Sequence, residues 1–381
     1  MKFYKNITMT FIITIIMGST IFIGTIFYYD PLKIFHKPWN DKSYLQSNMR
    51  EQVAGILRYW EYDSIILGTS ILENTSAKET SSLLGGTFVN LSIAGSDYFE
   101  RSLILDYALK HKKIKKVLYS LDNLGATRRG DPIYSYKKWN YLYDTNPFND
   151  INIYLNSRYL PCIFSLNTTK NCRGTKRDLD RPKAWYADKT TIATFGGFNK
   201  WIEHKDSVNM KHAFYLITKS FQQIKEKKTI NQQRIIAGIA RTKKYINSYI
   251  LTHAQEYPNT EFILLVPPYS RLVNSLILHR DMDSFLVYLK SIKYLVRLSS
   301  KQQNIKIYAW GNEDFLDDIE NYRDLTHFSE KINSWMLHAI YKQEGLLTLE
   351  NVDKYLKIVT KKTKDYDLLS IENKMKAAKL Y

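Results

Sequence analysis

Short apolar segments alternate with amphipathic ones along most of the chain. The apolar segments are rich in β-branched and aromatic residues and are bounded by turn residues, which is typical of strands. Polar and apolar positions do not alternate within them, so we expect both faces of each strand to be buried, as in a parallel sheet. The expected strands are 64–67, 87–93, 116–121, 261–266 and 305–310.

The segments between these strands carry apolar residues at helical spacing. In 101–111, for example, Leu105, Ala108 and Leu109 share one face of a helix. Strands that alternate with helices predict an α/β fold in which helices flank a parallel sheet on both faces. Ligands bind such sheets beyond the carboxyl ends of the strands. The expected helices are 50–59, 101–111, 235–254, 284–303 and 330–342.

The N-terminus contains an uncharged apolar segment, 6–29. At about 1.5 Å per residue, a helix of this length spans a bilayer core of about 30 Å. Lys2 and Lys5 precede the segment and aromatic residues 27–29 end it, so we expect one membrane span with the bulk of the chain outside the cytoplasm, in the periplasm. A cleaved signal peptide is the alternative, but the segment is longer than a usual signal-peptide core and no small-x-small cleavage site follows it.

The composition along the chain predicts four segments. We expect a cytoplasmic tip and transmembrane anchor in 1–30, a linker and entry helix in 31–60, the α/β domain in 61–345 and a helical tail in 346–381. Within the domain, 125–228 breaks the alternation and is dense in Tyr, Trp, Asn and Arg, which predicts an inserted cap or subdomain. The tail has apolar residues at helical spacing and many lysines, so its helices dock on the domain or lie on the membrane surface.

The chain has 55 Lys and Arg against 37 Asp and Glu, a net charge of +18. Such an excess suits an acidic partner such as nucleic acid, anionic lipid or acidic polysaccharide. Export argues against nucleic acid, and the spread of basic residues along the chain also fits ordinary solvated faces. The two cysteines, Cys162 and Cys172, can close a small loop in an oxidising compartment. Because no zinc-type Cys/His spacing occurs, we expect no metal and no cofactor.

Two short motifs far apart in the sequence carry candidate chemistry. Gly68-Thr69-Ser70 follows the first strand, so Ser70 lies at a carboxyl end of the sheet and could head a helix whose positive end faces an oxyanion. Asp324 and His327 follow the last strand, and their spacing lets the carboxylate orient the imidazole as a general base. Each motif alone has an ordinary explanation, with Ser70 and Asp324 as helix caps and His327 on the surface.

Together the motifs resemble those of the SGNH, or GDSL, hydrolase family. Its first block holds the nucleophilic serine in Gly-x-Ser and its last block is Asp-x-x-His, here residues 68–70 and 324–327. Residues 90–96, Asn-Leu-Ser-Ile-Ala-Gly-Ser, are similar to the second block, in which Gly95 would give an oxyanion N–H. The third block normally reads Gly-x-Asn-Asp; Asn123 is the candidate here, without the glycine two places before it.

The resemblance implies a three-layer SGNH-like sandwich with a Ser-His-Asp triad. In it Ser70 is the nucleophile, His327 the general base and Asp324 the residue that orients it, while Ser70, Gly95 and Asn123 form the oxyanion hole. The chain looks most like the membrane-anchored, extracytoplasmic SGNH-like proteins that work beside membrane-bound acyltransferases in polysaccharide O-acetylation and teichoic-acid D-alanylation.

We therefore expect an acyl-ester hydrolase or O-acyltransferase, with acetyl as the favoured group, that acts on an acylated cell-surface polysaccharide. A membrane-bound O-acyltransferase is the expected partner. The alternative is a non-catalytic, SGNH-like glycan-binding or scaffold protein, which the incomplete third block favours, because one missing oxyanion donor costs about 10²–10³ in rate.

Two further features have both a functional and a structural interpretation. Residues 267–270, Pro-Pro-Tyr-Ser, follow the fourth strand and either line the mouth of the pocket or form a plain strand-to-helix turn. The aromatic residues of the insertion either stack on sugar rings or build the core of the subdomain. They are Tyr134, Tyr136, Trp139, Tyr141, Tyr143, Trp185 and Trp201.

Overall fold

The computed structural model describes residues 2–39, 44–122, 124, 134–166, 169–226 and 229–380. The chain forms two compact units, which are described separately. The small unit consists of Met1–Glu61 and Tyr134–Asp178, and the large unit of Tyr62–Ile133 and Leu179–Tyr381. The segment 125–228, treated above as one insertion, is therefore divided between the two units.

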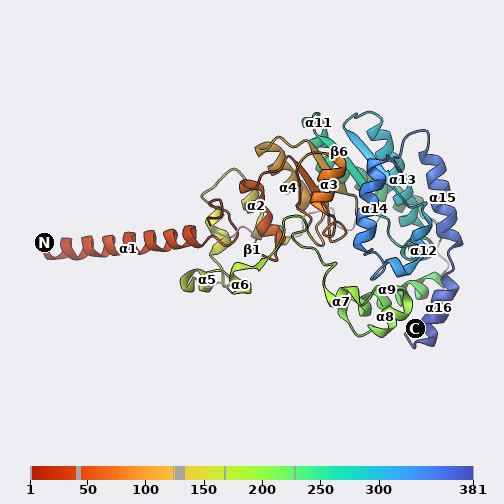
Figure 1. Cartoon of the computed structure of the whole chain (residues 1–381), viewed down its shortest axis with the longest axis horizontal. Helices are drawn as coiled ribbons and strands as arrows, with labels where there is room; N and C mark the ends of the chain where they lie inside the picture. Colours follow the sequence, from red (N-terminus) through yellow and green to blue (C-terminus); the bar gives the residue numbers. More distant parts are fainter. Residues whose placement is uncertain are drawn as a thin grey trace. The chain divides into compact units, whose positions relative to one another are not determined.

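The large unit contains a five-stranded parallel sheet in the order β3-β2-β4-β6-β7, of which β6 is labelled in Figure 1. The strands are β2 Ser64–Leu67, β3 Phe88–Asn90, β4 Lys116–Ser120, β6 Glu261–Val266 and β7 Ile305–Ala309. Nearly all of their residues are buried, which is why none shows alternation in the sequence. From β2 the chain moves outward to β3 and then crosses to β4 on the other side. The switch point between β2 and β4 is where ligands bind in such sheets.

Helices cover both faces of this sheet. One face packs against helices α9, α12 and α14 through a core that includes Ile66, Leu118 and Ile263, adjacent residues on neighbouring strands. In the opposite layer α10 packs along α13, and α13 lies beside β7. The helices are α3 Ala77–Leu84, α4 Tyr98–His111, α7 Lys189–Ile192, α8 Phe198–Glu203, α9 Val208–Ile224, α10 Gln232–Ile246, α11 Thr252–Glu256, α12 Arg271–Arg280, α13 Met282–Ser299 and α14 Glu330–Tyr341, with a π-helical turn at Asn247–Leu251. This arrangement confirms the expected α/β class.

The C-terminal tail forms helices α15 Val352–Asp365 and α16 Leu368–Ala377. Both dock on the large unit through the apolar faces that the sequence shows. Tyr355 of α15 is buried and its hydroxyl accepts a hydrogen bond from the Gly311 N–H, while Met375 of α16 is wholly buried in the core. Of the two arrangements expected for the tail, docking on the domain is the one that the structure shows.

The small unit contains α1 Lys2–Tyr29, α2 Met49–Tyr59, α5 Leu160–Ser165, α6 Lys170–Arg173 and a two-stranded antiparallel sheet of β1 Tyr44–Leu45 and β5 Thr175–Lys176. Within 31–39, expected to be a linker, residues 31–34 are buried instead. Leu32 and Ile34 are buried, and the buried Asp30 carboxylate accepts the Ile34 N–H. The apolar residues and the aspartate that fixes the turn hold this segment in place, although its sequence has no regular helical or strand period. Cys162 and Cys172 form a disulfide within this unit.

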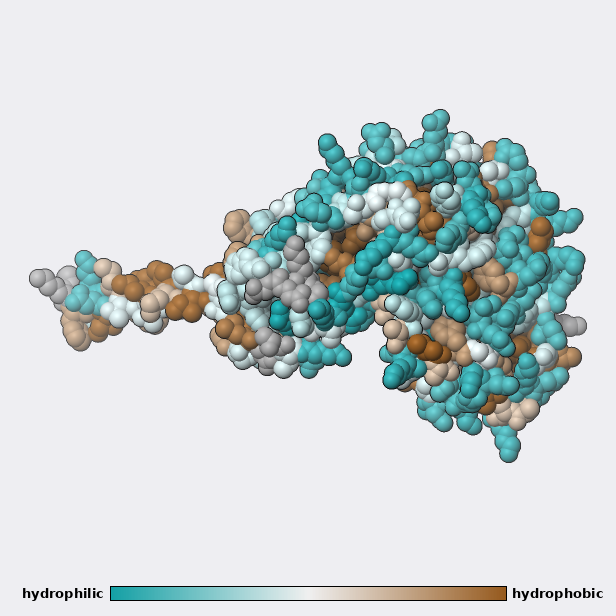
Figure 2. Space-filling model, viewed as in Figure 1, coloured by the Kyte–Doolittle hydropathy of each residue, from teal (hydrophilic) through white to brown (hydrophobic). Residues whose placement is uncertain are grey.

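Helix α1 is long and apolar enough over Phe3–Tyr29 to cross a membrane. Almost none of it is buried, and Figure 2 shows its apolar side chains at the surface. A continuous apolar surface of this kind is unfavourable in water and is what a membrane-spanning helix presents to lipid.

Truncation in the centre of the sheet should destabilise the protein strongly. Ile66 is completely buried, so Ile66→Ala should lower the free energy of unfolding by about 2–5 kcal/mol. The matched control is Ile236→Ala on α10, whose side chain is 64% exposed and whose loss should change stability by no more than about 0.5 kcal/mol. Denaturant titration of the full chain in detergent measures both, and equal effects would contradict the assigned core.

Candidate active site

Ser70, Asp324 and His327 lie together at the carboxyl edge of the sheet. The Ser70 Oγ is 2.8 Å from the His327 Nε2, although the two residues are 257 positions apart. On the other side of the ring, the His327 Nδ1 is 2.8 Å from Asp324 Oδ2 and 3.0 Å from Oδ1. A hydroxyl, an imidazole and a carboxylate in this order can activate the hydroxyl as a nucleophile.

The loop that carries Asp324 and His327 fixes their geometry locally. The Arg323 N–H donates to the His327 carbonyl. One oxygen of Asp324 accepts the backbone N–H groups of both Thr326 and His327 at 2.9 Å. Burial acts to raise the pKa of the Asp324 carboxyl, but the charge of His327 and the hydrogen bonds from His327 and Thr326 outweigh it and hold this pKa well below its usual range. Asp324 is therefore ionised at neutral pH and can stabilise a protonated imidazole.

Neighbouring elements hold the same loop against the sheet. The Trp201 Nε1 donates to the Tyr322 carbonyl at 3.2 Å, and the Ser270 Oγ donates to the Leu325 carbonyl at 2.6 Å. The Tyr322 hydroxyl donates to the carbonyl of Pro268 at 2.8 Å. The loop after β6 and the helix α8 therefore determine where His327 stands.

Ser70 lies in a turn and does not head a helix. Residues 70–74 form turns, and α3 begins only at Ala77, where the Ser76 hydroxyl accepts the Glu79 N–H. The prediction that a helix N-terminus at Ser70 stabilises the oxyanion is therefore wrong. The better-placed cap is Ser76, six residues later, and the helix starts there. A side chain at Gly68 would meet Leu72 at 2.9 Å, which explains the glycine before this turn.

The candidate oxyanion loop is tied to the backbone beside Ser70. Gly95 has a φ of +64°, which favours glycine, and it lies in an exposed turn. The Ile93 N–H and the Ser96 hydroxyl both donate to the Gly68 carbonyl, at 2.9 and 3.3 Å. These bonds keep the Gly95 turn next to the nucleophile loop. Asn123, the third expected oxyanion donor, lies outside the described residues.

Glu73 is a site residue that the sequence analysis does not identify. Only 4% of it is exposed, and its Oε1 accepts the Ala94 N–H at 3.1 Å, one residue before Gly95. Burial raises the pKa of the Glu73 carboxyl to about 7, against the opposing charges of Lys183, His327 and Arg323. A second proton-exchanging group therefore adjoins the triad and braces the oxyanion loop.

Trp185 is the aromatic residue of the insertion that reaches the site. Its Nε1 donates to the Ser70 carbonyl at 2.9 Å, and its ring lies edge-to-face with that of His327 at 5.7 Å. Its faces contact the Arg323 guanidinium, 4.5 Å from the ring centroid, and the stacked ring of Phe195. Trp185 therefore supports the candidate catalytic residues Ser70 and His327.

Three of the other six aromatic candidates belong to cores. Trp201 is fully buried in the large unit, and Trp139 and Tyr143 are buried in the small unit. The packing therefore supports a role for these residues in the cores, because buried rings cannot stack on a sugar.

Asp122, at the end of β4, connects the loops around the switch point. Its carboxylate accepts the Thr69 hydroxyl at 3.0 Å, the Tyr269 hydroxyl at 3.1 Å and the Arg101 guanidinium at 3.3 Å. Asp122 and Arg101 are both almost fully buried. One buried carboxylate thus links the loop of Ser70, the loop after β6 and helix α4.

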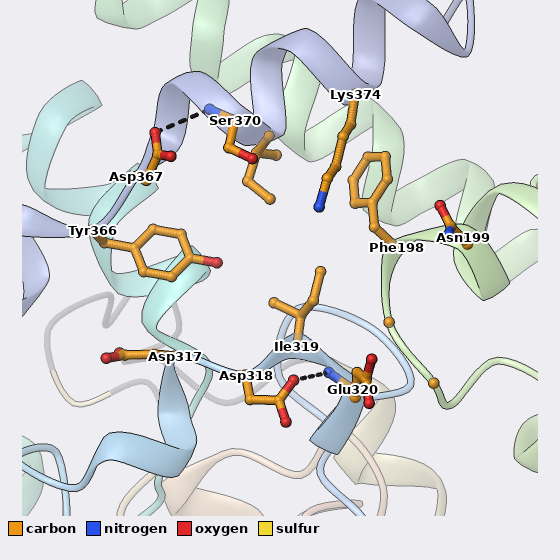
Figure 3. A pocket seen from close by; sticks show the side chains of 13 residues that line it. Phe198, Asn199, Asp317, Asp318, Ile319, Glu320, Tyr366, Asp367, Ser370 and Lys374 are labelled. Atoms are coloured by element: carbon orange, nitrogen blue, oxygen red, sulfur yellow. Dashed lines mark hydrogen bonds between the residues drawn. The ribbon is translucent and has the colours of Figure 1, made fainter.

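Among the cavities of the large unit, two differ clearly in character. The first, of about 100 Å³, is mainly apolar and is lined by residues after β4 and β6, including Pro267 and Tyr269, and by Thr326 of the catalytic loop. The second, of about 350 Å³, is polar: Lys374 of α16 points into it, Asp317, Asp318 and Glu320 line the opposite side, and Asp367 lies at the start of α16 (Figure 3). No member of the triad lines the second cavity.

Within the described residues, no group of three or more His, Cys, Asp or Glu side chains could hold a metal ion. Comparison with known proteins finds no family model, no curated protein and no solved structure that matches the chain. The functional assignment therefore depends on the geometry of the site and on the motifs that compose it.

The raised pKa of Glu73 predicts a specific pH dependence of stability. The folded state holds this proton up to about pH 7, whereas a free carboxyl releases it near 4.5. Ionisation therefore weakens the folded state, and the free energy of unfolding should fall as pH rises from about 4.5 to 7 and then level off. At 1.36 kcal/mol per pKa unit the full effect is about 3 kcal/mol.

Glu73→Gln keeps an oxygen for the Ala94 N–H but cannot ionise, so this decline should be absent in the variant. Urea unfolding of the full chain in detergent at pH 5 and pH 7.5 measures the difference. The exposed Glu256→Gln is the control and should keep the wild-type profile. A wild-type decline in Glu73→Gln would show that the carboxyl is not buried in this way.

Proposed function

We propose that this protein is an extracytoplasmic acyl-ester hydrolase or O-acyltransferase of the SGNH type that acts on an acylated cell-surface polysaccharide. The observation that carries the proposal is the hydrogen-bonded series Ser70, His327 and Asp324, with a Ser70 Oγ to His327 Nε2 distance of 2.8 Å. The anchor-length apolar helix α1 and the net charge of +18 support a membrane-bound protein with an acidic polymer as its substrate.

In the proposed reaction, the Ser70 Oγ attacks the ester carbonyl carbon while His327 Nε2 takes the hydroxyl proton. Asp324 holds the Nδ1–H and stabilises the imidazolium that forms. The N–H groups of Ser70 and Gly95 hold the tetrahedral oxyanion. The intermediate collapses as His327 gives its proton to the departing alcohol, which leaves an acyl-Ser70. Water or a glycan hydroxyl, deprotonated by His327, then takes the acyl group and regenerates the serine.

The alternative is a non-catalytic, SGNH-like scaffold or glycan-binding protein beside a membrane acyltransferase. The observation in its favour is the third block of the motif, which lacks the glycine before Asn123. Labelling of the nucleophile distinguishes the two proposals, because only an activated serine reacts with a serine-directed phosphonate.

Removal of the triad should abolish both labelling and ester hydrolysis. A fluorophosphonate probe should modify Ser70 of the full chain in detergent, as mapped by mass spectrometry. Ser70→Ala should lose the label and lower the hydrolysis of a p-nitrophenyl ester by at least about 10³-fold, and His327→Ala and Asp324→Asn should behave similarly. Ser300→Ala, at an exposed serine far from the triad in sequence, should retain both. Folded wild-type protein that takes no label would support the scaffold instead.

The proposed topology predicts that the C-terminus is outside the cytoplasm. Alkaline phosphatase fused after Tyr381 should be active, because this enzyme folds only after export, and a fluorescent protein that folds only in the cytoplasm should stay dark at the same position. Deletion of residues 2–29 should reverse both signals. A fluorescent full-length fusion would place the catalytic unit in the cytoplasm and remove the polysaccharide from consideration.

A further inference from the structure

The apolar cavity of about 100 Å³ lies at the same edge of the sheet as the triad. Its walls come from the loops after β4 and β6 and from helices α12 and α13. Leu121, Val266, Ile277 and Phe285 are among its lining residues, and the exposed lining is predominantly apolar. A cavity of this character favours a hydrocarbon group over water or a sugar.

Two of its walls adjoin the reacting groups. Thr326 lines the cavity and stands between Asp324 and His327, with its Oγ1 3.4 Å from the His327 Nδ1. Tyr269 lines it as well and donates its hydroxyl to Asp122, whose carboxylate also accepts the hydroxyl of Thr69, the residue before Ser70. The cavity is therefore lined by the residue next in sequence to His327 and by a residue that Asp122 connects to the Ser70 loop, while Ser70, Asp324 and His327 themselves do not line it.

The size of the cavity bears on the acyl group. An acetyl group ends in a single methyl and needs no such space. A volume of about 100 Å³ corresponds to about three groups the size of a water molecule or a methylene. Each methylene that moves from water into an apolar cavity gains about fourfold in binding.

We propose that this cavity binds the alkyl part of the acyl group, so that the substrates are esters of short-chain acyl groups longer than acetyl, of about four to six carbons. This inference rests on the proposed function and replaces the acetyl group that the sequence analysis favours. The polar cavity of Figure 3 is a poor alternative for this role, because carboxylates and a lysine line it.

The test is the chain-length dependence of ester hydrolysis by the full chain in detergent. With p-nitrophenyl acetate, butyrate, hexanoate and decanoate, kcat/KM should rise from acetate to butyrate or hexanoate by about fourfold per methylene and fall for decanoate, which exceeds the cavity. A value of kcat/KM that is highest for acetate, or that is independent of chain length, would overturn the proposal.

Variants that change the volume of the cavity strengthen the test. Val273→Phe should lower the butyrate-to-acetate ratio of kcat/KM by about tenfold, and Ile277→Ala should move the optimum to a longer chain, because both residues line the cavity. The matched controls are Val208→Phe, at a side chain that is 84% exposed, and Ile236→Ala on α10, at a side chain that is 64% exposed and outside the cavity lining. Both controls should keep the wild-type profile. Profiles that shift equally in controls and cavity variants would overturn the proposal.

Labelling separates a failure of this inference from a failure of the proposed function. Fluorophosphonates with a methyl or a butyl group on phosphorus place that group where the acyl chain would lie. Faster labelling of Ser70 by the butyl probe supports the cavity, and equal rates overturn the cavity alone. An absence of labelling by either probe overturns the cavity and the hydrolase together.

Discussion

The arrangement of the site depends on the buried carboxylate of Asp122. A carboxylate removed from water is unfavourable unless hydrogen bonds and a counter-charge replace its hydration. Here the Arg101 guanidinium supplies the charge and itself packs against the rings of Tyr98 and Tyr119, at 4.7 and 4.6 Å from their centroids. The hydroxyl of Thr69 and the loop after β6 donate further hydrogen bonds to the Asp122 carboxylate. The cost of leaving Asp122 unsatisfied therefore fixes the loop of Ser70 at the switch point of the sheet.

Electrostatics at the triad divides between two carboxyl groups with opposite behaviour. Asp324 accepts two backbone N–H groups and faces His327, so it remains ionised and favours a charged imidazole. Glu73 is buried and accepts the Ala94 N–H. Its pKa of about 7 leaves the carboxyl largely neutral below that pH. In the proposed reaction, a neutral Glu73 keeps a negative charge away from the developing oxyanion. Environment, and not residue type, gives the two acids different roles.

The sequence predicts the sheet well because strands buried on both faces leave continuous apolar segments, as in 64–67 and 261–266. The pairing of Asp324 with His327 can also be predicted from the sequence, because both residues lie in one short loop. The roles of Glu73, Asp122 and Trp185 could not be predicted, because they arise from contacts between distant parts of the chain. Trp185, for instance, meets the Ser70 carbonyl across 115 positions. The packing of 31–39 was missed for a related reason, since the carboxylate of Asp30, and no regular period, organises that segment.

Different strand ends supply different parts of the proposed reaction. The loop after β2 carries Ser70, the loop beyond β7 carries the base and its orienting acid, and the ends of β4 and β6 form the apolar cavity. Because Asp122 joins the first and the last of these through hydroxyl groups, the residues deeper in the cavity on α12 and α13 can change without disturbing the nucleophile. Selection of the acyl group is thereby separable from the chemistry, which is how one α/β scaffold can serve esters of different chain lengths.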